Sequence, residues 1–183
     1  MNSLPQESVL SSCCWIFLII WALFGISINE RDQRAYTLQH AGPEAIVEYQ
    51  TFSLWHSKAA ELRRVGDTFE LEGKVLAAKQ PGQFVISGLA YFVLRIFGLQ
   101  YESNYLLTAS LVTWFSSSFL AALGASAIFL VCRKCWGLAR INSTITAFSY
   151  ALASILFPYA GVAHHDVLAL SFLVLSFAAI ELA

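Results

Sequence analysis

Long apolar runs constrain the fold of this chain more than any other feature. Val9–Ile28 contains no charged residue, and as a helix it is about 30 Å long, enough to cross the hydrocarbon core of a bilayer. Only 13% of the 183 residues are charged and 57% are hydrophobic, whereas an ordinary soluble domain is about 25% charged. The sequence therefore predicts an integral membrane protein.

Further apolar runs are predicted to span the membrane at residues 106–132, 143–160 and 166–182. Gly82–Gly98 is also apolar, but Arg95 interrupts it and its helix is about 25 Å long, so it is predicted to be an interfacial or a short membrane helix. We expect an all-α fold, a polytopic transmembrane helix bundle that forms a single membrane domain over residues 1–183. Because the last apolar run has no polar cap after it, we expect the chain to be truncated at the C-terminus.

The polar segment at residues 29–81 is predicted to be a long first outer loop that carries juxtamembrane helices. Apolar residues at helical spacing predict an amphipathic helix that begins near Pro43 or later and ends at Gly66. This helix either lies flat in the membrane interface or covers a small soluble subdomain. Alternation over Phe69–Val75 predicts a short extended segment. The basic turn at residues 133–140 favours the cytoplasm by the positive-inside rule, which places the loop outside.

Charged residues follow the first span directly, at Glu30, Asp32 and Arg34. They form either a solvated helix end or the rim of an active site, in which a carboxylate is the base and an arginine holds an anionic group. Lys79 and Gln80 precede Pro81, which is tolerated in the first turn of a helix. A lysine and amide donors beside the N–H groups of a helix N-terminus suit a phosphate, and the alternative is a boundary turn whose lysine reaches water.

A second polar cluster, His164 and His165, lies between the last two apolar runs. These histidines are either simple interfacial residues or part of the phosphate site. If Gly82–Gly98 lies in the interface, the histidines share one membrane face with Glu30, Asp32 and Lys79. If it spans the bilayer, the histidines lie on the opposite face and no composite site forms.

Several classes of site are disfavoured by the same sequence. A formal charge of −1 gives no reason to expect binding to nucleic acid. Cys132 and Cys135 have C-x-x-C spacing, but a structural zinc site usually needs four ligands and no second pair lies nearby, so we expect no metal there. No cofactor is required by the sequence, although a divalent cation is compatible with it.

The order of these motifs resembles that of the polytopic GT-C glycosyltransferases of the protein-mannosyltransferase and aminoarabinose-transferase type. Those proteins are similar in having an acidic–arginine segment directly after the first span, here Glu30–Arg34. A Lys-Pro-Pro or His-Pro-Pro-Gly-like motif then opens an apolar helix, here Lys79-Gln80-Pro81-Gly82. A later outer turn is similar to Phe157-Pro158-Tyr159 with His164-His165. Gln80 stands where a first proline is usual, and Glu30-Arg31-Asp32 replaces an Asp-Glu pair.

The resemblance implies an inverting membrane glycosyltransferase that moves a hexosyl or pentosyl group from a polyprenyl-phosphate-linked donor to an acceptor on the outer face of a bacterial inner membrane. It implies Asp32 or Glu30 as the catalytic base. It implies that the donor phosphate is bound by Lys79, Arg34, Gln80, His164 and His165. The partners are then the lipid-linked sugar donor and the lipid bilayer.

Two alternatives stay open beside this resemblance. Members of the family have more spans than this chain shows, so the fragment alone need not be active. A different class is a non-enzymatic integral membrane protein, a transporter or scaffold fragment. Transporters place ionisable residues near mid-membrane, whereas here only Arg95 and Glu181 lie within apolar runs.

Overall fold

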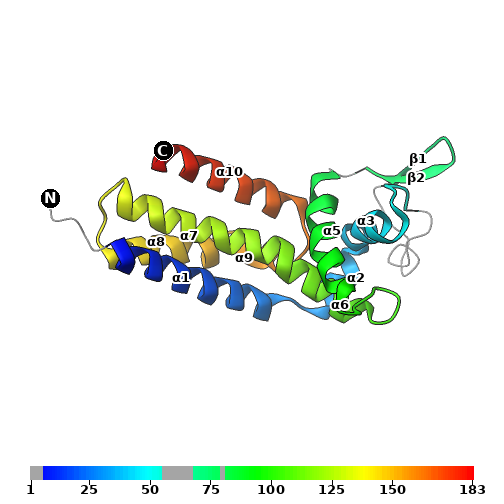
Figure 1. Ribbon diagram of the computed structural model, residues 1–183, viewed down its shortest axis with the longest axis horizontal. Coiled ribbons are helices and arrows are strands. Elements are labelled where there is room, and N and C mark those ends of the chain that lie inside the picture. Colours follow the sequence, from blue (N-terminus) through cyan, green and yellow to red (C-terminus); the bar gives the residue numbers. More distant parts are fainter. Residues whose placement is uncertain (1–5, 55–67, 79–80) are drawn as a thin grey trace.

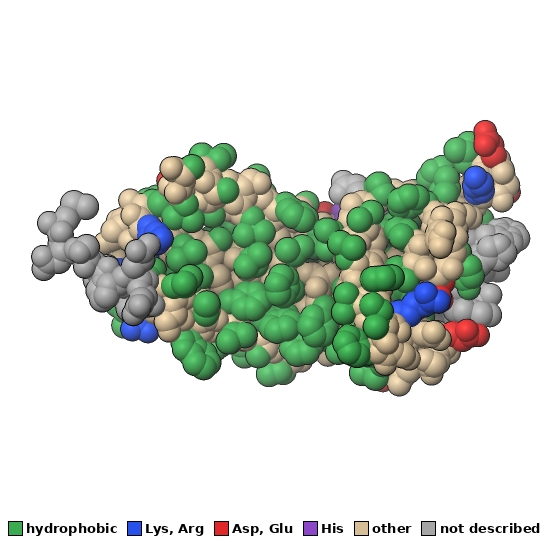
Figure 2. Space-filling view, viewed as in Figure 1, with side chains coloured by type: hydrophobic (Ala, Val, Ile, Leu, Met, Phe, Trp, Pro, Cys, Tyr) green, Lys and Arg blue, Asp and Glu red, His purple; other side chains and the backbone are tan. Residues whose placement is uncertain are grey.

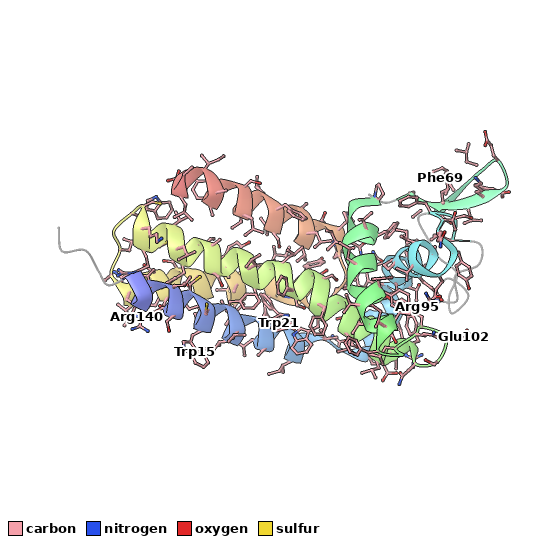
Figure 3. All side chains as sticks on the ribbon, in the orientation of Figure 1. Trp15, Trp21, Phe69, Arg95, Glu102 and Arg140 are labelled. Atoms are coloured by element: carbon pink, nitrogen blue, oxygen red, sulfur yellow. The ribbon has the colours of Figure 1, made fainter. Side chains whose placement is uncertain are left out.

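Three long helices lie along the longest axis of the molecule. The computed structural model describes residues 6–54, 68–78 and 81–183, which are mostly helical. Figure 1 shows α7 (Phe119–Lys134) between α1 (Gln6–Ser27) and α10 (His165–Leu182). The start of α1 and the end of α10 lie at the same end of this bundle as Arg140, and we call it the basic end (Figures 1 and 3). The opposite end, which carries α2, α3, α5 and the hairpin, is called the loop end.

Within the described residues, three helical stretches are long and apolar enough to cross a membrane. They are Val9–Ser27, Tyr105–Lys134 and His165–Leu182. The second is one continuous rod made of α6 (Tyr105–Thr113), the π-helical turn η1 (Trp114–Ser118) and α7. These stretches coincide with the spans predicted at residues 9–28, 106–132 and 166–182, and they support a helical membrane protein.

The single span predicted at residues 143–160 is wrong as one helix. The structure has α8 (Arg140–Leu152) and a separate short α9 (Leu156–Ala160). Pro158 explains the break, because it has no N–H for the carbonyl of Ser154 and its ring would clash with that carbonyl in a continuous helix. The hydroxyl of Ser154 instead accepts a hydrogen bond from the backbone N–H of Leu156, 3.1 Å away. Together α8 and α9 carry the chain from the basic end to the loop end (Figure 1).

Two tryptophans join α1 to the central rod at the π-helical turn. The indole N–H of Trp21 donates to the carbonyl of Trp114 at 2.9 Å, and that of Trp114 donates to the carbonyl of Trp21 at 3.0 Å. Their rings stack with centroids 4.7 Å apart. An indole N–H inside an apolar region is costly without an acceptor, and here each ring finds one on the partner helix. The exchange therefore fixes the axial position of α1 against the rod.

The loop end begins with two short helices. α2 (Glu30–Ala35) leads directly into α3 (Thr37–Tyr49), which ends at Gln50 with a left-handed φ of 52°. The amphipathic helix predicted to begin near Pro43 or later does not include residues 50–54, which are not helical, and Pro43 itself lies inside α3. The remainder of that prediction falls on residues 55–67, outside the described residues.

A two-stranded hairpin projects from the loop end. β1 (Thr68–Leu71) pairs antiparallel with β2 (Lys74–Ala77), and Thr68 lies opposite Ala77. The turn residues Glu72 and Gly73 both have positive φ, 51° and 73°, as a two-residue hairpin turn of type I′ requires. The extended segment predicted over Phe69–Val75 is thus confirmed, and it adds a small sheet to the otherwise helical fold.

Helix α5 (Pro81–Ile96) runs across the loop end instead of alongside the long helices (Figure 1). Its inner face carries the polar side chains of Gln83, Ser87 and Tyr91, which are buried against the protein. Apart from Arg95 in the last turn, the large side chains exposed on its outer face are apolar: Val85, Leu89, Phe92, Val93 and Ile96. A helix with polar groups inside and apolar groups outside is typical of contact with hydrocarbon. Figure 2 shows the apolar surface of this region continuing onto the bundle.

The crosswise direction of α5 favours the interfacial alternative for Gly82–Gly98. Arg95 lies in the last turn of α5 and pairs with Glu48 of α3 at 2.6 Å, and Glu48 also accepts a 2.6 Å hydrogen bond from the hydroxyl of Tyr91. Burial, together with the Glu48 carboxylate, raises the pKa of Tyr91. The charge that interrupts the apolar run is therefore neutralised at the loop end rather than inside the bundle.

Candidate functional site

A buried glutamine joins the two polar regions that the sequence analysis singled out. Gln33 of α2 is fully buried, and its amide donates to the carbonyl of Gly161 at 3.0 Å. Its side-chain oxygen accepts from Thr113 and from His40 Nε2, each at 3.0 Å. Its backbone carbonyl accepts from Tyr105 at 3.0 Å. Gln33, on the helix that follows the first span, thus holds together α2, α3, α6 and the turn before α10.

His40 is the second member of this network. Because the oxygen of Gln33 is an acceptor, His40 Nε2 carries the hydrogen, and Nδ1 is left to accept from the hydroxyl of Tyr101 at 3.3 Å. Complete burial lowers the pKa of His40 to about 3, and burial raises the pKa of Tyr101. Both rings are therefore neutral near pH 7, and their role is to fix the loop end.

The histidine turn lies directly beside α2. The ring of Tyr36, which ends α2, meets the ring of His164 edge-on with centroids 5.8 Å apart. Tyr159 contacts the same imidazole at 5.3 Å. The structure therefore brings the segment after the first span and the turn before the last helix to the same end of the bundle, the geometry that a composite site requires.

The turn forms a compact group that we call the His-His-Asp cluster, consisting of His164, His165 and Asp166. His164 is the N-cap of α10, and its Nδ1 accepts from the backbone N–H of Asp166 at 3.3 Å. The carboxylate of Asp166 lies 3.4 Å from His164 Nδ1 and 3.3 Å from His165 Nε2. The two imidazoles are stacked, with centroids 4.4 Å apart. Asp166 was not among the predicted site residues, although its position next to the two histidines was a usable signal.

The predicted acids, Glu30 and Asp32, both lie on α2, and each has a partner on its own segment. Glu30 and Arg34 form an exposed ion pair one helical turn apart, at 2.7 Å. Asp32 is in the first turn of α2, where its N–H donates to the side chain of Asn29 and its carboxylate accepts from the amide of Asn29 at 2.6 Å. This reciprocal capping fixes Asp32 and is one physical reason for its place in the sequence.

Two predicted phosphate-binding residues, Lys79 and Gln80, lie outside the described residues. Pro81, which follows them, is the first residue of α5, the position predicted for it.

A proline inside α3 explains one more buried contact. Pro43 has no N–H, so the carbonyl of Gln39 loses its partner within the helix. The amide of Gln83 on α5 donates to that carbonyl at 3.4 Å. The side-chain oxygen of Gln83 is itself buried with no hydrogen-bond partner in the part of the chain that the structure describes. Gln83 has no signal in the sequence, because its pairing depends on a proline 40 positions earlier.

An apolar groove opens beside the His-His-Asp cluster. It has a volume of about 130 Å³ and lies between α9 and α10. Its walls are formed by Ile155, Leu156, Val167 and Leu170, and its rim by Tyr159 and Asp166. An apolar wall that ends at titratable groups matches the shape of an amphiphile, in which a hydrocarbon tail carries a polar head.

A comparison with known protein families, curated proteins and solved structures gives no match to this chain.

Proposed function

We propose that this chain is the donor-binding part of a membrane glycosyltransferase of the GT-C type, acting on a polyprenyl-phosphate-linked sugar. The observation that carries the proposal is the apolar groove between α9 and α10, whose rim reaches Asp166 beside His164 and His165. A polyprenyl tail in that groove would place its phosphate next to the cluster. The sugar would then lie toward α2, since Tyr36 at the end of that helix contacts His164.

The chemistry assigned to the site is a single displacement. An acceptor hydroxyl or amine attacks the anomeric carbon, and the bond from that carbon to the phosphate oxygen breaks with its electron pair leaving on the phosphate. The acceptor proton passes to a carboxylate, for which Asp32 is the first candidate and Glu30 the second. Cationic groups near the leaving phosphate lower the barrier by stabilising the charge that develops there.

The positions of the ionisable groups support a surface-facing site over a path through the membrane. Arg95 is paired with Glu48 at the loop end, and Glu181 lies in the last turn of α10 at the basic end. Within the described residues, the long helices thus carry their charges at their ends, whereas transporters usually place such groups near mid-membrane.

A matched pair of variants on α10 tests the proposal. Leu170→Trp fills the groove, whereas Leu173→Trp adds the same ring to an exposed position on the same helix. The binding of a fluorescent polyprenyl phosphate is measured on the purified chain in detergent. We expect about tenfold weaker binding for Leu170→Trp, which corresponds to about 1.4 kcal/mol, and no change for Leu173→Trp.

Equal binding by the two variants would show that the groove does not hold the lipid tail. If polyprenyl phosphate binds no more tightly than the uncharged polyprenol, a phosphate-binding site is excluded. For the reaction itself, Asp32→Asn is expected to abolish sugar transfer by the full-length protein while leaving donor binding intact.

A further inference from the structure

We propose that His164, His165 and Asp166 bind one divalent metal ion, and that this ion, rather than the imidazoles alone, anchors an anionic phosphate at the mouth of the groove. The phosphate part of this inference rests on the proposed function, whereas the binding of the metal does not. Each residue offers one ligand atom, and the three atoms lie within 4.8 Å of one another.

The distances within the cluster fit a shared ion. Donor atoms bound to one ion at about 2.0–2.1 Å lie roughly 3 Å apart, a little more in tetrahedral than in octahedral geometry. Oδ2 of Asp166 lies 3.4 Å from His164 Nδ1 and Oδ1 lies 3.3 Å from His165 Nε2, so the carboxylate is close to this distance from both imidazoles. Binding of the ion through His164 Nδ1 would replace the hydrogen bond that this atom accepts from the N–H of Asp166. Two imidazole nitrogens and one carboxylate form a donor set that suits zinc, cobalt or manganese.

The net charge of the His-His-Asp cluster is a second reason to expect a metal ion there. With both imidazoles neutral, the form that binds metals, the cluster carries the −1 of Asp166 and repels a phosphate. Adding a divalent ion changes this to −1 + 2 = +1, which attracts one. The carboxylate next to the groove therefore disfavours direct binding of a phosphate and favours binding of the phosphate through a metal ion.

The exposure of Asp166 leaves one side of the cluster open for the bridging ligand. The side chains of His164 and His165 are only 16% and 18% exposed, whereas that of Asp166 is 75% exposed. Three protein ligands with one open side are typical of a site that also holds a water or a substrate oxygen. The rim of the groove lies on Asp166, so the tail of an amphiphile in the groove would bring its head group to that open side.

The test is a titration of the purified, chelator-treated chain in detergent with Co²⁺, followed by visible absorption. We expect one equivalent to bind with nitrogen and oxygen ligands. We expect at least about tenfold weaker binding in His165→Gln, Asp166→Asn and His164→Asn. His164→Asn is chosen because asparagine keeps the N-cap hydrogen bond of α10 while removing the imidazole, so a loss of binding is not a loss of the helix.

Two controls distinguish the cluster from other ligands. Cys135→Ser removes the exposed thiol near the basic end, and Glu102→Gln removes an exposed carboxylate at the loop end. Both are expected to bind Co²⁺ as the wild type does. Failure of the wild type to bind Co²⁺, binding unchanged in the three cluster variants, or a thiolate charge-transfer band that disappears in Cys135→Ser would each overturn the metal site.

The second measurement separates this inference from the proposed function. Polyprenyl phosphate is titrated into the chain with and without Co²⁺, and the metal is expected to tighten its binding. If Co²⁺ binds through the cluster but has no effect on the lipid, the metal site stands and its role as a phosphate anchor is wrong. If polyprenyl phosphate binds in the groove equally well without metal, the proposed function stands and the metal-bridged contact is wrong.

Discussion

The side-chain amide of Gln33 donates a hydrogen bond to the backbone carbonyl of Gly161, 3.0 Å away and 128 positions later in the chain. This bond ties the segment after the first span to the turn before the last helix. Gly161 is in close contact as well, because a Cβ there would lie 2.7 Å from the hydroxyl of Ser27. The end of α1, the start of α2 and the histidine turn therefore form one rigid unit.

Removing this contact is expected to destabilise the loop end. Gln33→Leu leaves the carbonyl of Gly161, His40 Nε2 and the hydroxyl of Thr113 without their partner, and buried polar groups without partners cost about 1–3 kcal/mol each. We expect a total loss on the order of 3 kcal/mol, measured by denaturant unfolding in detergent. Arg31→Gln, an exposed change on the same helix, is the control and is expected to stay within about 0.5 kcal/mol. Equal stability of the two variants would contradict the structural role of Gln33.

The buried His40 predicts a pH dependence of stability. Its pKa is about 3 in the folded chain because of burial, whereas an unfolded histidine has a pKa of about 6.5. Because the unfolded state binds the proton first, stability from this residue is fully present above pH 6.5 and falls as the pH decreases. Between pH 7 and pH 5 we expect a loss of about 2 kcal/mol in the free energy of unfolding. His40→Gln should lack this component, so an equally steep pH dependence in the variant would show that His40 is not its source.

Two glycines provide a matched test of the packing between α3 and α5. A Cβ on Gly42 would overlap the ring of the buried Phe84, whereas a Cβ on Gly82 would meet nothing within 4 Å. Gly42→Ala is expected to destabilise the protein by about 1–3 kcal/mol through overpacking. Gly82→Ala is expected to be neutral or to stabilise it by up to about 1 kcal/mol, since alanine is the better helix former. The thermal unfolding of both variants measures the difference, and the reverse order would exclude this packing.

The position of α5 predicts which residues share a membrane face. In a background without native cysteines, Arg31→Cys, before α5, and Glu102→Cys and Asp166→Cys, after it, are expected to react with a membrane-impermeant thiol reagent from the same side. Arg140→Cys is expected to react from the other side, since Figure 3 shows Glu102 and Arg140 at opposite ends of the bundle. Labelling of Arg31→Cys and Asp166→Cys from different sides would mean that α5 crosses the bilayer, and the composite site would be excluded.

Some of the candidate site could be read from the sequence and some could not. His164 and His165 were found because two adjacent polar residues interrupt an apolar run. Gln33 and His40 were missed, because a glutamine in a charged segment and a lone histidine carry no pattern that reveals complete burial. Their roles depend on Thr113, Tyr101 and Gly161, which come from three other parts of the chain.

The break in the helical segment at residues 143–160 was missed for a different reason. It contains no charged residue, and its hydropathy is insensitive to a missing N–H. Pro158 was visible in the sequence, but the effect of a proline depends on its surroundings. Pro43 lies inside a helix that does not break, because Gln83 supplies the hydrogen bond that Gln39 would otherwise lose.

The sequence by itself determined three long helices apolar enough for a membrane and the extended conformation of most of the hairpin. Length and hydrophobicity of a run decide whether a helix can cross hydrocarbon, and a local turn decides whether two strands can pair, so both are properties of neighbouring residues. Only the tertiary structure decided that α5 lies across the bundle and that α2 meets the histidine turn. These depend on buried hydrogen bonds between distant residues, which form only after the helices have packed and excluded water.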